Sequence, residues 1–224
     1  MNPLIKRFFR LILGLFLYAL GIAITMKAHI GYAPWEVFHA GIGRTIGMSI
    51  GTVSIIAGIV IGILAWILGE KLGLGTVLNM LLIGIFLDLL LAGNTIPTMH
   101  AFAPGVIMLI VGLFIISLAS YYYIGSGFGA GPRDSLMVAL QRKTGFPVGY
   151  CRAAIEVSAV LIGWMLGGMV GAGTLISAIA IGFCIQITFR ILHFDTTRVH
   201  HETLNETFRV ARSKSPNGAP ETNE

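Results

Sequence analysis

The chain has 224 residues, of which 55% are hydrophobic and only 11% are charged. Soluble domains are about 45 to 50% apolar and about 25% charged, so this composition excludes an ordinary water-soluble surface. The formal net charge of +5 would suggest nucleic acid as the partner of a soluble protein. Here the basic residues flank apolar segments, which suits an anionic membrane surface instead. We therefore expect the lipid bilayer as a partner, and no nucleic acid.

Six apolar stretches are long enough to cross a bilayer. A hydrocarbon core about 30 Å thick requires about 20 mostly apolar residues in helical form. Hydropathy and charge breaks together predict spans near 8–27, 50–69, 75–92, 104–124, 150–169 and 174–192. Two shorter helical segments, 34–46 and 132–144, remain between spans, and the sequence leaves open whether they are interfacial or re-entrant. The predicted fold class is all-α and polytopic.

Basic residues fall mainly on one side of the predicted spans. With a cytoplasmic N-terminus, thirteen of the fifteen Lys and Arg residues lie inside, and only Lys27 and Arg44 lie outside. The positive-inside rule then places both termini in the cytoplasm. The segment 193–224 is polar and lacks the apolar content that would offset the entropy cost of ordering, so we predict a disordered cytoplasmic tail.

The chain contains an internal repeat. Residues 14–92 align without a gap onto residues 112–190 at a constant offset of 98, and Trp-x2-Gly-x3-Gly-x-Gly-Thr occurs in both copies. Each copy holds three predicted spans, an odd number, so the second copy must enter the membrane in the opposite orientation. The predicted organisation is a cytoplasmic N-terminus and the start of the first span (1–13), a first repeat (14–92), an external connector leading into the fourth span (93–111) and a second repeat (112–192). Inverted repeats are the plan of many secondary transporters, with the solute site near the repeat interface.

A turn motif precedes the short helical segment in each half. It reads Pro-x-(Glu or Asp)-x7-Arg, with Pro34, Glu36 and Arg44 in the first half and Pro132, Asp134 and Arg142 in the second. Proline at the first helical position and a carboxylate in the first turn both favour a helix start. Two interpretations stay open. The segments are either capped interfacial connectors, or broken helices whose carboxylates and Gly31 and Gly129 turns face a shared cavity.

Ionisable residues inside predicted spans are the other candidates, because charge in a bilayer is costly. Asp88 is either a pathway residue or an interfacial one. Glu156 lies deeper, with Arg152 one helical turn before it, and such a pair can neutralise both groups. The candidate ligand or pathway residues are Gly31, Pro34, Glu36, Arg44, Asp88, Gly129, Pro132, Arg133, Asp134, Arg142, Arg152 and Glu156.

The turn segments carry a resemblance to a known family. Residues 30–36 read Ile-Gly-Tyr-Ala-Pro-Trp-Glu and residues 128–134 read Phe-Gly-Ala-Gly-Pro-Arg-Asp, each followed by Gly-x3-Gly and later by Gly-x-Gly-Thr. Over roughly residues 10–192 the chain resembles the YczE/YyaS/YitT group of bacterial multi-pass membrane proteins, and most of all its YczE branch. The resemblance implies a bacterial inner-membrane protein of uncharacterised activity, with some members linked to secondary-metabolite production. It supplies no catalytic residues.

The sequence predicts a small secondary transporter or channel-like permease for an unknown small molecule or ion. The alternative is a non-transporting membrane factor that binds or regulates a partner, for example in secondary-metabolite production. We expect no enzyme, because no nucleophile–base pair or His-Glu-x2-His motif occurs, and no cofactor or metal, because Cys151 and Cys184 lack metal-ligand spacing. A polar cavity between the repeats would favour transport, whereas a dry, close-packed interface would favour a scaffold.

Overall fold

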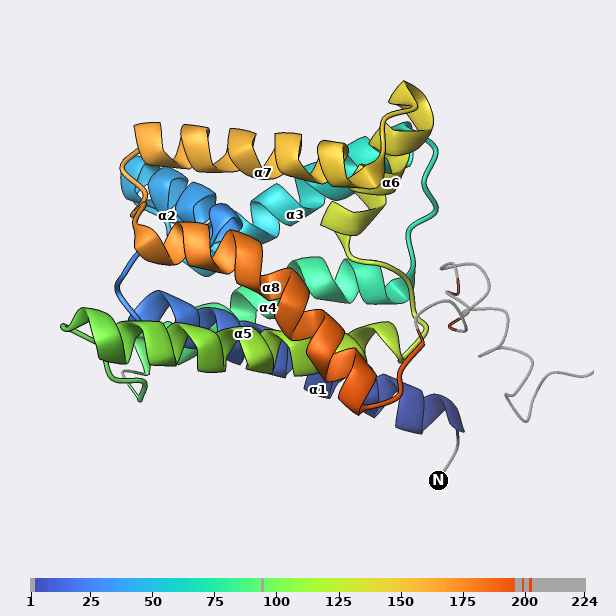
Figure 1. Ribbon diagram of the computed structural model, residues 1–224. Helices are drawn as coiled ribbons and strands as arrows, with labels where there is room; N and C mark the ends of the chain where they lie inside the picture. The colour runs from blue at the N-terminus through green and yellow to red at the C-terminus, as the bar shows by residue number, and fades with distance from the viewer. Residues whose placement is uncertain (1–2, 94, 196–198, 200–201, 203–224) are drawn as a thin grey trace, which may run out of the picture.

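Figure 1 shows the computed structural model, which describes residues 3–93, 95–195, 199 and 202. Within these residues the chain forms eight helices and no strands, so the all-α prediction is confirmed. The helices are α1 (Pro3–Lys27), α2 (Pro34–Ile46), α3 (Ile50–Ile67), α4 (Leu74–Ala92), α5 (Phe102–Ile124), α6 (Pro132–Thr144), α7 (Val148–Met165) and α8 (Ala172–Ile191). Most of the predicted tail, 193–224, lies outside the described residues.

Six of the described helices, α1, α3, α4, α5, α7 and α8, are long and apolar enough to cross a membrane. They match the predicted spans within a few residues, apart from the start of α1 at Pro3. α1 begins before its apolar part because the basic residues of its first turns bind partners in the protein. The Nε atom of Arg7 donates to the carbonyl of Ser126 at 2.9 Å, and the Arg10 guanidinium lies 4.5 Å from the centre of the Tyr121 ring.

The two short helices begin in the middle of the molecule. After α1 the chain turns back between the long helices, and α2 then returns to the side on which α1 ended; α6 does the same from the opposite side (Figure 1). Pro34 and Pro132 are the first residues of these helices, as predicted. Both helices therefore begin between the long helices rather than at their ends.

Helices of the two halves pack on each other in matching pairs. α1 and α5 lie side by side, α2 packs on α7 and α6 on α3, and α4 packs on α1 and α8 on α5. Leu11, Leu15, Leu109 and Leu113 form part of the core at the α1–α5 contact. In these pairs corresponding helices make corresponding contacts, as an internal repeat requires. The inverted orientation of the halves in a membrane stays a prediction.

The Gly-x-Gly-Thr motifs hold the turns that precede the short helices. The Gly75 N–H donates to the carbonyl of Phe128 at 2.7 Å, and the Gly173 N–H donates to that of Ile30 at 2.8 Å. A Cβ atom at Gly73 or at Gly171 would overlap the backbone of these turns. The third span of each half therefore anchors the turn of the other half. Gly73 and Gly171 therefore permit the close approach of these turns.

Candidate functional site

A cavity of about 280 Å³ lies where the N-terminal ends of α2 and α6 meet. Its charged lining residues are Glu36, Arg133, Asp134, Arg152 and Glu156, and its polar lining includes Tyr18, His39, Ser54, Asn79, Ser120, Tyr123 and Ser177. Only 11% of the chain is charged, so five charged side chains around one cavity are a marked concentration. Ionisable groups at bilayer depth are costly, and helix packing does not need them.

The first two turns of α2 bring an acid and an imidazole to the cavity. Glu36 is 5% exposed and His39 is 1% exposed, and their spacing of three residues places both on one face of the helix. None of the ion pairs among the described residues includes Glu36. The partial positive charge at a helix N-terminus favours a carboxylate in this turn, and Pro34 stands at the first position of the helix.

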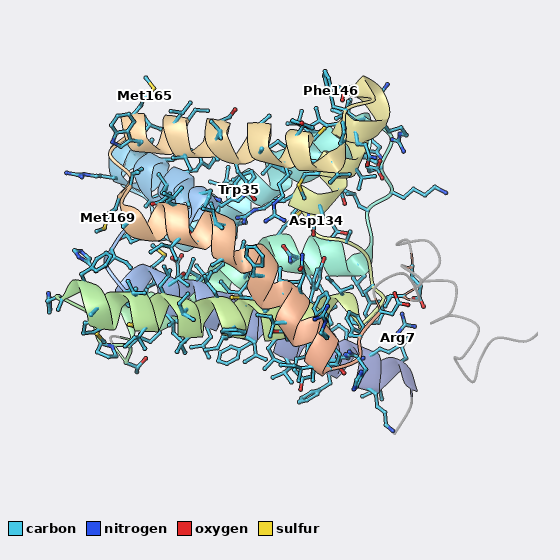
Figure 2. The ribbon with its side chains drawn as sticks, viewed as in Figure 1. Arg7, Trp35, Asp134, Phe146, Met165 and Met169 are labelled. Carbon is cyan, nitrogen blue, oxygen red and sulfur yellow. The ribbon has the colours of Figure 1, made fainter. Side chains whose placement is uncertain are left out.

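The first turn of α6 faces that of α2 across the cavity. The Arg133 guanidinium lies 4.3 Å from the centre of the Trp35 ring, a cation–π geometry that is more favourable in a desolvated site. Trp35 and Asp134 both lie in the centre of the molecule (Figure 2). Asp134 occupies the position in α6 that Glu36 occupies in α2. Both halves therefore contribute an acid to the same cavity.

The predicted pair in α7 is present and belongs to the cavity wall. The Nε atom of Arg152 lies 2.8 Å from Oε1 of Glu156, one helical turn away, and both residues line the cavity. The pair partly neutralises the two groups, as the sequence suggested. Its place in the wall means that it also sets the field that a solute would meet.

Asp88 lies outside this cavity. Its carboxylate accepts hydrogen bonds from the Ser49 hydroxyl and, at 2.8 Å, from the Gly51 N–H. Both donors belong to the start of α3, where the backbone N–H groups have no helical partner. Asp88 therefore ties the end of α4 to the beginning of α3.

The remaining candidates secure the ends of the short helices. Arg44 donates to the carbonyl of Gly167 at 3.4 Å, and Arg142 donates to that of Leu68 at 2.8 Å. Gly31 and Gly129 have φ values of 115° and 116°, in the left-handed region that favours glycine. None of these four residues lines the cavity. Pro132, the first residue of α6, does line it.

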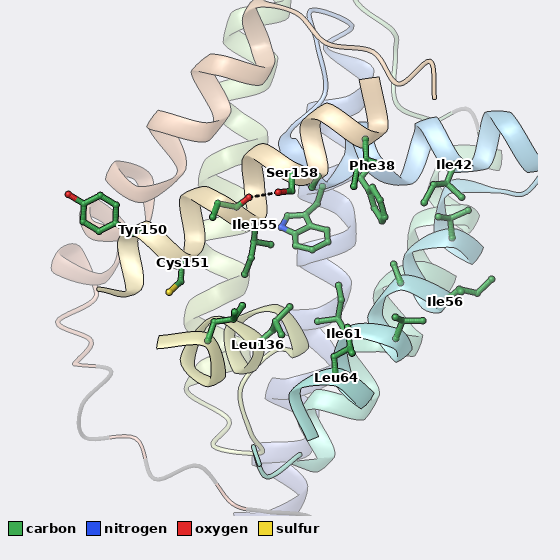
Figure 3. A pocket seen from close by; sticks show the side chains of 18 of the residues that line it. Phe38, Ile42, Ile56, Ile61, Leu64, Leu136, Tyr150, Cys151, Ile155 and Ser158 are labelled. Carbon is green, nitrogen blue, oxygen red and sulfur yellow. Dashed lines mark hydrogen bonds between the residues drawn. The ribbon is translucent and has the colours of Figure 1, made fainter. Parts of the chain in front are cut away.

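A second hollow, an apolar groove of about 1170 Å³, is lined by residues of α2, α3, α6 and α7 (Figure 3). Its walls carry half-exposed aliphatic side chains such as Val60 and Ile162. Trp35, Ile61 and Ile155 line both hollows and separate them. The groove is the larger of the two but offers few polar groups, so it suits acyl chains or an apolar partner rather than a polar solute.

Comparison with known proteins gives the family. The model described as "Family of unknown function (DUF6198)" matches residues 5–190. The chain belongs to this family. It is 32% identical over 177 residues to the uncharacterized membrane protein YczE of Bacillus subtilis, covering 78% of this chain and 81% of that protein. An uncharacterized protein of Haemophilus influenzae is 30% identical over 182 residues, covering 81% and 83%, and the uncharacterized protein YyaS of Bacillus subtilis is 25% identical over 187 residues, covering 81% and 92%.

The match to DUF6198 confirms the resemblance inferred from the turn motifs, and its extent covers every cavity residue named above. No solved structure matches the chain. This DUF6198 member is a multi-pass membrane protein.

Most of the residues that line the cavity were not among the sequence candidates, and three of them are His39, Trp35 and Tyr123. His39 could have been found, because it lies one turn after Glu36 on the same short helix. Trp35 and Tyr123 gave no such signal, since aromatic residues in membrane proteins are common at interfaces. The Tyr123 hydroxyl is buried without a hydrogen-bond partner among the described residues. An unpaired hydroxyl in a cavity wall is available to a bound molecule.

The described residues contain no group of three or more His, Cys, Asp or Glu side chains that could hold a metal ion. Cys151 and Cys184 are both buried, and neither forms a disulfide.

Proposed function

We propose that this protein is a small secondary transporter or permease that binds a small polar solute in the cavity between α2 and α6. The observation that carries the proposal is the charged lining of this cavity, contributed by both halves of the chain. Broken helices whose ends meet at a repeat interface near the bilayer midplane are typical of transporter sites. A scaffold would instead fill its centre with closely packed small and apolar residues.

The size and charge of the cavity favour a small cationic solute. Its volume of about 280 Å³ is just below the range of about 300 to 1,000 Å³ that holds drug-sized ligands. Three carboxylates and two guanidinium groups line it, and the Arg152–Glu156 pair accounts for one of each. The carboxyl groups of Glu36 and Asp134 and the guanidinium group of Arg133 remain in the lining, and the ammonium group of a solute would bind the carboxyl groups.

We place the protein in a bacterial inner membrane with both termini in the cytoplasm. Arg133 and Arg152 line the central cavity, and eleven of the other thirteen Lys and Arg residues then lie inside, in agreement with the positive-inside rule. This placement rests on charge distribution and on the family resemblance.

The test is a thermal-stability screen of the purified protein against small amines and amino acids. A solute bound only by the folded state adds about 2.7 kcal/mol of stability at 100 times its dissociation constant. We expect Glu36→Gln to weaken this stabilisation at least tenfold in apparent affinity while the unliganded protein melts as before. Glu70→Gln is the control, because Glu70 pairs with Arg142 and does not line the cavity. Retained binding and flux in a Glu36→Gln, Asp134→Asn double variant would refute the shared site.

The apolar groove favours one second candidate, a membrane factor that binds an apolar partner helix there without moving a solute. Proteoliposomes separate the two functions. Uptake of a stabilising amine that Glu36→Gln reduces would support transport. Stabilisation by a partner in the absence of any uptake would support the membrane factor.

A further inference from the structure

The two halves of the chain differ at one helix interface. α3 packs closely on α4, but the corresponding helices α7 and α8 do not pack on each other. Figure 1 shows α7 and α8 meeting near the loop 166–171 and diverging toward the end of the molecule that carries the N-terminus. One pair of equivalent helices is therefore closed and the other is open.

Glycines at equivalent positions report the same difference at atomic scale. A Cβ atom at Gly51 would overlap the carbonyl oxygen of Gly84 and the Asp88 carboxylate. At Gly149 and Gly182, the equivalent positions 98 residues later, no atom outside the local backbone lies within 4 Å. A close glycine contact in the first half thus has an unused counterpart in the second.

Asp88 holds the closed pair through the Ser49 hydroxyl and the Gly51 N–H. This contact lies where α3 begins and α4 ends, on the side opposite the N-terminus (Figure 1). The equivalent residues of the open pair are Pro147, Gly149 and Gln186.

Both helix pairs line the cavity. Arg152 and Glu156 from α7, and Ser177, Ala178 and Ile181 from α8, all line it. Their equivalents 98 residues earlier, Ser54 and Gly58 of α3 and Asn79, Met80 and Ile83 of α4, line it as well, so each helix pair forms one wall of the cavity.

Side-chain sizes indicate that α7 and α8 can also close. In the closed pair, Gly58 of α3 faces Met80 of α4, because a Cβ at Gly58 would lie 3.3 Å from the Met80 side chain. The equivalent residues are Glu156 in α7 and Ala178 in α8. The small residue of the first pair, Gly58, lies on α3, whereas the small residue of the second pair, Ala178, lies on α8. Each interface thus combines one large side chain with one small residue, as close packing requires.

We propose that α7–α8 and α3–α4 are two alternating gates of the cavity, with α7–α8 open and α3–α4 closed in this structure. Closing the second gate brings Gly149 against Gly182 and places Gln186 where Asp88 lies in the first gate. The hydrogen bonds of Asp88 break as α3 leaves α4. The state described here is open toward the N-terminal, cytoplasmic side. This inference rests on the proposed function only in its assumption that the exchange of the two gates serves solute transport.

The chemistry of the two gates differs and sets the resting state. A carboxylate at position 88 makes charge-assisted hydrogen bonds, which are about twice as strong as neutral ones. Gln186 offers a neutral amide, and Pro147 has no hydroxyl to donate to it. The first gate is therefore the more stable when closed, in agreement with the state that the structure shows.

Disulfide cross-linking tests the exchange. In a chain with Cys151→Ala and Cys184→Ala, the pair Ser49→Cys, Asp88→Cys joins positions that are in contact here, and Pro147→Cys, Gln186→Cys joins their equivalents. Disulfides require Cα atoms about 4.4 to 6.8 Å apart. We expect the first pair to cross-link rapidly under mild oxidation and the second pair to cross-link more slowly. The second pair should react several-fold faster when Asp88→Asn weakens the first gate in the same chain.

A packing variant supplies the matched control. Gly182→Leu adds a side chain where the structure has open space, so it should leave the melting temperature unchanged but stop cross-linking of Pro147→Cys, Gln186→Cys. Failure of this pair to cross-link while the first pair does, or a rate indifferent to Asp88→Asn, would overturn the proposal. Cross-linking does not depend on a solute. If both cysteine pairs cross-link as expected but no amine is bound or transported, the result would contradict the proposed function and still support the two gates.

Discussion

Alanine at Gly84 and alanine at Gly182 should have opposite effects on stability, although the two positions are equivalent in the repeat. Both are in helix interiors, where Gly→Ala stabilises a helix by about 0.5 to 1 kcal/mol. At Gly84 the new Cβ would meet the carbonyl oxygen of Gly51 and the side chain of Ile55, and at Gly182 it would meet nothing within 4 Å. Overpacking of a closed interface costs about 1 to 3 kcal/mol.

The intrinsic effect is common to both variants and cancels in their comparison. Gly84→Ala should therefore unfold with a free energy about 1 to 3 kcal/mol lower than Gly182→Ala. Equilibrium unfolding in mixed detergent micelles, followed by circular dichroism, measures this difference. Gly182→Ala itself should be as stable as the parent chain or slightly more so. Equal stability of the two variants would refute the assignment of one closed and one open interface.

Further predictions concern the first gate, the turn before α6 and the orientation of the chain. Asp88→Asn should lower the free energy of unfolding by about 1 to 3 kcal/mol, because hydrogen bonds to a charged acceptor are replaced by weaker ones. An unchanged free energy in the same unfolding assay would contradict the role of Asp88 in holding α3 against α4. Thr76→Val should cost about 1 to 3 kcal/mol, since the Thr76 hydroxyl donates to the carbonyl of Ala130 at 2.6 Å. Thr76→Ser keeps the hydroxyl and should retain most of that stability, and a loss as large as that of valine would point to packing instead. In whole cells of the Cys151→Ala, Cys184→Ala chain, an impermeant thiol reagent should label Thr95→Cys directly and Lys143→Cys only after permeabilisation; the reverse pattern would overturn the predicted orientation.

Local sequence signals were sufficient for most helix boundaries. The short helices begin and end at the predicted residues, 34–46 and 132–144, because proline fixes the start and a glycine in the left-handed region, Gly47 or Gly145, follows the end. The end of α7 at Met165, earlier than predicted, follows from the turn at Gly167, which has a φ value of 84°. Hydropathy does not register a turn made of small apolar residues.

The candidate site was predictable only in part. Glu36 and Asp134 were found because a carboxylate at the start of a short helix is a local pattern that occurs twice. The place of Asp88 depends on donors at the start of α3, 37 residues away from it at Gly51. The cation–π contact between Arg133 and Trp35 joins the two halves, and no sequence spacing within either half predicts it.

The sequence by itself determined that this protein spans a membrane with six helices, that it repeats, and where its short helices start. These properties follow from the cost of placing polar groups in hydrocarbon and from the conformations that proline and glycine allow, and both act over a few residues. Only the tertiary structure decided which of two equivalent interfaces is closed. Gly51 and Gly84 have the same sequence signature as Gly149 and Gly182. The difference between the gates arises because long-range contacts, and above all the hydrogen bonds of Asp88, favour one of two similar packings.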